Sequence, residues 1–232
     1  MDLFEQSPDG WTLIGGRLVQ LHCWERGGTP TRTTTDIDAG LDVRGTVSII
    51  ADFTAARKQL NFTSAGFTPD GHQHRWVRDR VVIDVLIPAS VGERVGSQLT
   101  RDGARMLESH GIQQAIQRTE IVRVTVGRRT GHVRRPTLFG ALVAKSAALR
   151  NHGDLNKQRH LEDFLQLCAL LQFTDVPNDM SKRDSLHLGN MLGNLINHGF
   201  EPNPGHQSYI GVQLLRKRLA RRNELDGSDR SN

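Results

Sequence analysis

The sequence predicts an α+β protein in which a mixed β-sheet with flanking helices is followed by a bundle of helices. Two observations predict this fold class. Up to about residue 135, short apolar runs alternate with Gly and Pro and with helix-like stretches, whereas from Pro136 onward apolar residues recur at helical spacing. We therefore expect an α/β domain over residues 1–135, a helical domain over 136–222 and a flexible tail over 223–232.

The first part contains four apolar runs of strand length, each bounded by turn-forming residues. They cover residues 12–14, 35–43, 81–87 and 121–126. Helical patterns lie between them, at residues 16–25, 52–60 and, more weakly, 111–117. The strict alternation of residues 122–126, followed by a glycine-containing turn at 127–131, predicts a β-hairpin.

The second part predicts four helices. Pro136 suits the first position of a helix because its missing N–H needs no partner there. Leu138, Leu142, Lys145 and Leu149 then share one helical face. Asn156 is a candidate cap for a helix with an apolar stripe over 161–171, and two further helices are expected at 185–196 and 207–222.

Composition excludes several classes of protein. The chain has 232 residues, a net charge of +5 and a pI of about 9.8, so an anionic partner is permitted but not required. Its two cysteines, Cys23 and Cys168, exclude a disulfide scaffold and a cysteine-built zinc site. No apolar run is long enough to span a membrane, and the first residues lack a signal-peptide pattern. We expect a cytoplasmic protein.

The segment Arg32-Thr33-Thr34-Thr35-Asp36-Ile37-Asp38 places two carboxylates at alternate positions of a strand. Residues i and i+2 point to the same side, so Asp36 and Asp38 are expected to project together while Ile37 faces the core. Such a pair repels itself unless a cation neutralises it, and oxygen ligands of this kind suit Mg²⁺ together with a nucleotide's phosphates. The alternative is a solvated strand face, which Gly40 and Asp42 would continue.

A third acid, Asp84, interrupts six apolar residues in the run over 81–87. A run of this kind is typical of a strand buried on both faces, where an ionised carboxylate needs a metal, a hydrogen bond or an ion pair. The sequence therefore predicts a metal-binding triad of Asp36, Asp38 and Asp84. The alternative for Asp84 is a salt bridge to Arg75, Arg78 or Arg80.

A glycine pair, Gly15-Gly16, lies where the first strand runs into a helix. Glycines at such a junction let backbone N–H groups approach a phosphate, although many pairs of this kind are ordinary turns. The ten histidines form no zinc-binding pattern, and we expect His72 and His74 to face solvent.

The glycine pair, the D-I-D motif and the later acid together resemble the nucleotidyltransferase superfamily typified by DNA polymerase β, and the fuller pattern resembles the AbiEii/MenT-type toxins. The R-x-T-x-D-I-D motif is matched by Arg32, Thr34, Asp36, Ile37 and Asp38. The resemblance implies Mg²⁺-dependent transfer of a nucleoside monophosphate from an NTP, with a tRNA 3′ end as acceptor. It also implies a block of translation and a cognate antitoxin. Arg32 and Thr34 would then contribute to nucleotide binding.

Lys145 shares the apolar helical face described above, which is unusual for a lysine. Its ammonium group either reaches water along an apolar surface or contacts the triphosphate, where the toxin group has a lysine; Arg150 could join it. Asp163, with Lys157, resembles the acidic stretch of the same group. Asp163 either contacts the nucleotide or holds Lys145 or Arg150 in place, and we favour the second role.

Basic residues gather around the predicted hairpin and on the last helix, where they favour either RNA binding or a solvated charged face. They are Arg123, Arg128, Arg129, Arg134 and Arg135 in the hairpin, and Arg216, Lys217, Arg218, Arg221 and Arg222 in the helix. Three other functions stay open from the sequence: nucleotidyl transfer to a small molecule or a protein, a non-catalytic nucleotide- or RNA-binding module, and an interaction protein in which the acids are incidental.

Overall fold

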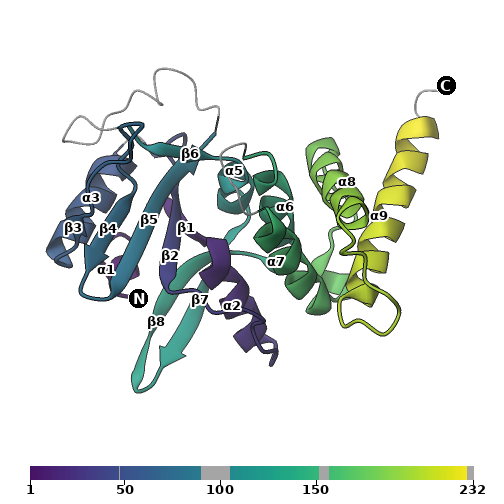
Figure 1. The fold of residues 1–232 in the computed structure, drawn as a ribbon, viewed down its shortest axis with the longest axis horizontal. Helices are drawn as coiled ribbons and strands as arrows, with labels where there is room; N and C mark the ends of the chain where they lie inside the picture. The colour runs from purple at the N-terminus through teal and green to yellow at the C-terminus, as the bar shows by residue number, and fades with distance from the viewer. Residues whose placement is uncertain (47, 90–104, 152–156, 229–232) are drawn as a thin grey trace.

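The computed structural model describes residues 1–46, 48–89, 105–151 and 157–228 of the chain. Figure 1 shows a sheet with its surrounding helices on one side and a group of helices on the other. The α+β fold class is therefore as predicted. Within the described residues, none of the helices is both long and apolar enough to cross a lipid bilayer.

A mixed sheet forms the first part of the molecule, in the spatial order β1-β2-β5-β4-β3, with β6 paired to the end of β5. The central pair β2–β5 is parallel, and so is the β5–β6 pair, whereas β1 and β4 run antiparallel to their neighbours. The strands are β1 (Trp11–Ile14), β2 (Asp36–Leu41), β3 (Thr63–Ser64), β4 (Arg75–Arg78), β5 (Val81–Pro88) and β6 (Leu107–Ser109).

Within the described residues, four helices accompany this sheet. Two of them, α2 and α5, pack on β1 and β2, and α3 reaches β1 through an edge contact between Phe53 and Trp11. The helices are α1 (Asp2–Gln6), α2 (Gly15–Glu25), α3 (Ile49–Gln59) and α5 (Ile112–Ile116).

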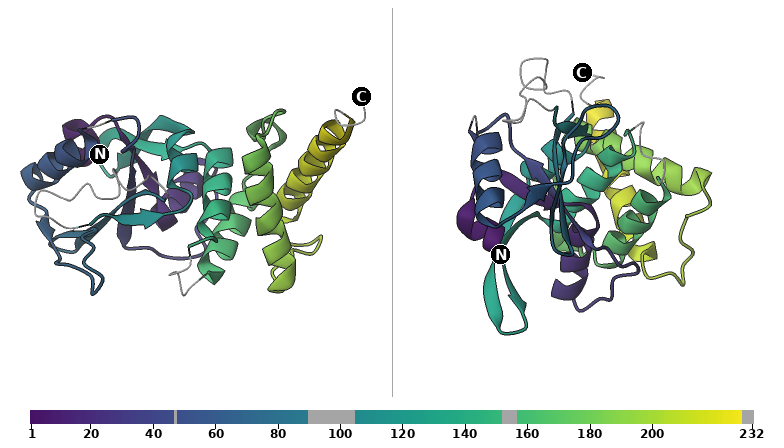
Figure 2. Two further views of the ribbon diagram at one scale, coloured as in Figure 1. Left: turned by 90° about the horizontal axis from the view of Figure 1, so that it is seen from above. Right: turned by 60° about the vertical axis from the view of Figure 1, so that its left-hand side comes forward.

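The predicted hairpin forms a separate two-stranded sheet of β7 (Thr119–Val126) and β8 (Arg129–Pro136). Its turn projects away from the rest of the molecule, as Figure 2 shows clearly. The base of the hairpin contacts β1, so the two sheets are joined there.

The second part of the chain is helical, and it shares one apolar core with the sheet. Helix α6 lies next to α5, α7 and α8, and α9 packs on α7 and α8. The elements are α6 (Leu138–Ala148), α7 (Gln158–Ala169), a 3₁₀ turn η1 (Phe173–Asp175), α8 (Lys182–Asn197) and α9 (Tyr209–Ser228).

Several helix boundaries differ from the sequence prediction, and α3 and α8 each begin three residues earlier than expected. Pro136 ends β8 instead of starting a helix; α6 begins at Leu138, because the Thr137 side chain caps it by accepting a hydrogen bond from the Gly140 N–H. Helix α9 continues to Ser228, past the point where we expected a flexible tail. The proposed cap Asn156 lies outside the described residues.

Candidate active site

The structure brings the three predicted aspartates together. Strands β2 and β5 are parallel neighbours, and their register places Asp38 directly beside Asp84. Adjacent strands lie about 4.8 Å apart, so these two residues are close enough to interact strongly. Asp36 projects from the same face of β2 as Asp38, and all three line a cleft of about 370 Å³ between the sheet and α6. Ile37 packs against the core, as the alternation predicted.

Asp84 forms the ion pair that was the alternative to metal binding, and its partner is Arg75. Its guanidinium donates two hydrogen bonds to Asp84, at 2.9 and 2.7 Å, and approaches Asp36 at 3.4 Å. The other two candidate arginines, Arg78 and Arg80, do not make this pair. Among the described residues, no three acidic, histidine or cysteine side chains converge closely enough to hold a metal ion in this arrangement. The Arg75 side chain is 46 % exposed, so it can leave without unpacking the core.

The pKa of the Asp38 carboxyl is shifted by its surroundings in the cleft. Burial and the negative charges of Asp84 and Asp36 raise the pKa of the Asp38 carboxyl to about 6, although Lys145 and Arg159 act in the opposite direction. Like charges and burial both disfavour the ionised form. A cation placed beside Asp38 would remove both penalties, so the donor set fits a divalent metal ion.

The glycine pair lies directly against these acids. Gly15 has a φ of +70°, and a Cβ built on it would lie 1.7 Å from Asp38 Oδ2. A Cβ on Gly16 would lie 2.7 Å from Arg32 Nη2. No side chain fits at either position without moving Asp38 or Arg32, so the two glycines keep the start of α2 open to the cleft.

Gly15→Ala is expected to destabilise the protein by several kcal/mol and to displace Asp38. The left-handed backbone alone costs about 1–2 kcal/mol, and the overlap with Asp38 adds to it. Gly27→Ala is the matched control, because Gly27 also has a φ of +70° but its Cβ would meet nothing within 4 Å. Urea unfolding of both variants measures the difference. Equal losses of unfolding free energy would show that Asp38 does not press on Gly15.

Lys145 and Asp163 form a buried ion pair behind the cleft. The Lys145 ammonium donates to Asp163 Oδ2 at 2.6 Å, and the two side chains are only 6 % and 3 % exposed. Arg32 donates two further hydrogen bonds, each 2.8 Å, to the same carboxylate. Although burial raises it, these cations hold the pKa of Asp163 below its usual value.

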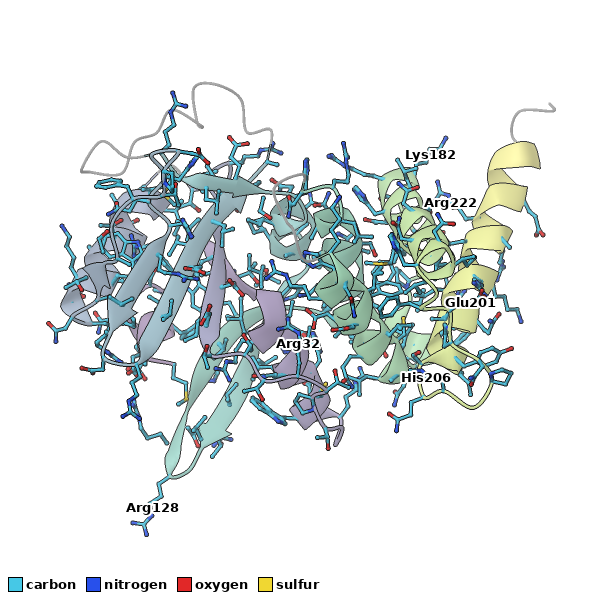
Figure 3. All side chains as sticks on the ribbon, viewed as in Figure 1. Arg32, Arg128, Lys182, Glu201, His206 and Arg222 are labelled. Atoms are coloured by element: carbon cyan, nitrogen blue, oxygen red, sulfur yellow. The ribbon has the colours of Figure 1, made fainter. Side chains whose placement is uncertain are left out.

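The three residues of this network differ in whether they reach the cleft. Lys145 and Arg32 both line the cleft, whereas Asp163 is not among the described residues that do. Figure 3 shows Arg32 close to α2. The ammonium of Lys145 is not in bulk water, so its alternative role as a solvated lysine is wrong. Asp163 holds Lys145, which is the role we favoured for it, but its second partner is Arg32 rather than Arg150.

The remaining predicted residues divide between two cavities. Thr34 lines the cleft. Arg150 does not line it but borders a second, smaller cavity next to it. His74 also lines the cleft and is partly buried, with a pKa lowered chiefly by burial, so the expectation that it faces solvent is wrong.

Sequence reasoning missed several residues of the cleft wall. They are Ser109, His110, Asn151, Arg159 and His160. Asn151 accepts a hydrogen bond from the His110 N–H at 2.8 Å and donates one to Ser109 Oγ at 2.9 Å. No local pattern marks this contact, because its partners are 41 and 42 residues apart in the chain.

Most of the hairpin arginines are engaged within the protein. Three of them pair with acids: Arg129 with Asp2, Arg134 with Asp9, and the buried Arg135 with Glu25 and Glu120. Arg123 and Arg128 make no ion pair in the described part of the chain, and Arg128 lies at the hairpin tip (Figure 3). The last helix is not simply a solvated basic face either: Arg218 is buried, with its guanidinium over the Phe173 ring.

The mixed sheet and the helical second half together form a nucleotidyltransferase-like fold. An antigenic nucleotidyltransferase-like protein from Paracoccidioides brasiliensis is similar to this chain, with a TM-score of 0.50 and 14 % identity over 84 % of this chain and 85 % of that one. The structure of ANT(2″)-Ia in complex with adenylyl-2″-tobramycin matches with a TM-score of 0.43 and 12 % identity, over 83 % of this chain and 92 % of that one. No protein-family model and no curated protein matches this chain in sequence.

Proposed function

We propose that the protein is a Mg²⁺-dependent nucleotidyltransferase that moves a nucleoside monophosphate from an NTP to an acceptor hydroxyl. One observation carries this proposal: three aspartates on adjacent parallel strands line a cleft that two cations, Lys145 and Arg32, also line. An arrangement of carboxylates and cations suits a metal-bound triphosphate, because each group neutralises a different part of the substrate.

Asp36, Asp38 and Asp84 would hold Mg²⁺, with Arg75 moving away from Asp84 and Asp36 to make room. The raised pKa of Asp38 supports this assignment, since it marks a place where negative charge lacks a partner. When bound, Mg²⁺ would supply neutralisation of the triphosphate and of the charge that develops during transfer.

The protein's own groups would position the substrates and accept a proton. Gly15 and Gly16 leave space for the phosphates at the start of α2, and Lys145, Arg32 and Thr34 line the cleft beside them. The acceptor oxygen forms a bond to the α-phosphorus while the bond to the bridging oxygen breaks and pyrophosphate leaves. The hydroxyl proton passes to a carboxylate, the role we assign to Asp84 once Arg75 has moved.

We propose RNA, with a tRNA 3′ end as the specific candidate, as the acceptor. The excess of basic residues supports an anionic partner, and the motif resemblance to AbiEii/MenT-type toxins supports the role of a cytoplasmic toxin that blocks translation until an antitoxin binds it. Under this proposal, expression of the wild-type protein arrests growth and Asp38→Ala relieves the arrest.

Incubation with labelled NTPs, Mg²⁺ and total tRNA tests the reaction. The wild-type protein should transfer label to tRNA, and Asp36→Asn should lose most of that transfer, by about 100-fold or more, because it removes a negative charge from the proposed Mg²⁺ site. Equal transfer by both proteins would rule out the site. A screen of small-molecule and protein acceptors separates the rival reactions, and NTP binding without any turnover would favour a non-catalytic binding module.

A further inference from the structure

A second cavity lies beside the active-site cleft and has a strongly cationic lining. Its volume is about 220 Å³, and residues 109–111 border both spaces, so the two share a wall. Three arginines and two histidines contribute to it, and no Asp or Glu is among its described lining residues; the five are Arg44, Arg150, Arg183, His110 and His187.

His187 gives this cavity a buried hydrogen-bonding group. The residue is only 3 % exposed, and its Nε2 has no hydrogen-bond partner among the described residues. A buried polar atom of this kind costs free energy unless a ligand or a water satisfies it. Burial, and then the charges of Arg183 and Arg150, lower the pKa of His187. The neutral ring can still donate one N–H to an anion.

Arg150 and Arg183 supply the charge from two different helices. Arg150 follows the end of α6, and Arg183 lies in the first turn of α8. Both are exposed and make no ion pair within the described parts of the chain. Guanidinium groups bind phosphate oxygens with two parallel hydrogen bonds, so a cavity with this lining suits a phosphate better than a neutral ligand.

The position of the cavity relates it to the acceptor rather than to the NTP. Lys145, Arg32 and the glycine pair line the active-site cleft, where we place the triphosphate. None of them is among the described residues of the second cavity, which lies on the other side of the wall formed by residues 109–111. A strand whose terminal hydroxyl enters the cleft could place a backbone phosphate behind this wall.

We propose that the second cavity binds a backbone phosphate of an RNA acceptor and thereby positions its terminal hydroxyl in the cleft. The inference rests on the proposed function, because it assigns the cavity to the acceptor of that reaction. It also identifies a role for Arg150 that differs from the nucleotide contact expected from the sequence.

Fluorescence anisotropy with a short single-stranded RNA, labelled at its 5′ end and free at its 3′ end, tests this without requiring catalysis. Arg183→Ala and Arg150→Ala should each weaken binding about tenfold, and each should reduce the slope of log affinity against log salt by about 0.7. Arg80→Ala is the matched control, since it removes an exposed arginine at the opposite end of β5 and should change neither quantity.

The buried histidine provides a second, independent measurement. His187→Leu removes the Nε2 donor and should weaken RNA binding, whereas His187→Gln keeps an N–H near the same place and should restore it. Thermal unfolding of both variants verifies that each is folded before its affinity is compared with that of the wild-type protein.

Three outcomes would overturn the proposal. The first is a wild-type protein that does not bind RNA, as a small-molecule or protein acceptor would require. The second is an equal loss of RNA binding in Arg80→Ala. The third is a loss of NTP or pyrophosphate affinity in Arg183→Ala, measured by calorimetry, with RNA binding intact. RNA binding that depends on Arg183 without any label transfer would contradict the proposed function but leave this phosphate subsite standing.

Discussion

Replacing Asp38 by asparagine should abolish nucleotidyl transfer and, at the same time, stabilise the metal-free protein. The loss of activity, about 10³-fold, is expected because the variant removes a negatively charged ligand from the proposed metal site. The gain in stability is expected because the ionised carboxylate is partly buried beside Asp84 and Asp36. Asparagine has nearly the same shape as the protonated acid, so it removes the repulsion without leaving a cavity.

The direction of the pH effect follows from the raised pKa of Asp38. Its value of about 6 lies above the usual 3.8, so the folded protein holds this proton more tightly than the unfolded chain does. The contribution of Asp38 to stability is therefore most favourable below about pH 4 and is lost as pH rises through about 6. The shift corresponds to about 3 kcal/mol in the free energy of unfolding.

Urea unfolding in the presence of a chelator measures this effect as the difference between wild type and Asp38→Asn. The two proteins should have similar stability near pH 4, and the variant should be more stable at pH 8. Asp70→Asn serves as the control, since Asp70 is exposed and does not line the cleft, so its charge does not act on Asp38. A difference in stability between wild type and Asp38→Asn that stays constant from pH 4 to pH 8 would contradict the assigned repulsion.

The sequence predicts the acids of the cleft because their signals are local. Alternation along one strand identifies Asp36 and Asp38, and a single charge within an apolar run identifies Asp84. Arg75 was only one of three candidate partners for Asp84, because the choice depends on the antiparallel register of β4 and β5, which places Arg75 opposite Asp84. That register is set by the packing of the whole sheet rather than by the four residues of β4.

The positions of the two cations that line the cleft, Lys145 and Arg32, were only partly predictable for the same reason. Lys145 is conspicuous on an apolar helical face, but its partner Asp163 lies on another helix, and Arg32 reaches the same carboxylate from 131 residues away in the chain. The second cavity has no signal in the sequence at all. It is made where α5, α6 and α8 meet, and its arginines are far apart in the chain.

Replacing Asp163 by leucine should destabilise the protein by about 3–5 kcal/mol, because it leaves the Lys145 ammonium buried without a counter-charge. Arg32 also loses both of its hydrogen bonds to the carboxylate. NTP binding should weaken as well, since the two cations that line the cleft lose the group that fixes them.

The double variant Lys145→Met, Asp163→Leu separates the structural role of this pair from its role in binding. Replacing a buried ion pair by apolar residues of similar volume is often neutral or stabilising, so the double variant should regain most of the unfolding free energy that Asp163→Leu loses. It should not regain NTP affinity, because the cleft still lacks the Lys145 charge. Chemical denaturation and calorimetric NTP titration of the three proteins measure the two properties separately. If the double variant recovers both stability and NTP affinity, Lys145 serves only to neutralise Asp163. If it recovers neither, apolar residues cannot replace this ion pair, and other groups depend on its charges.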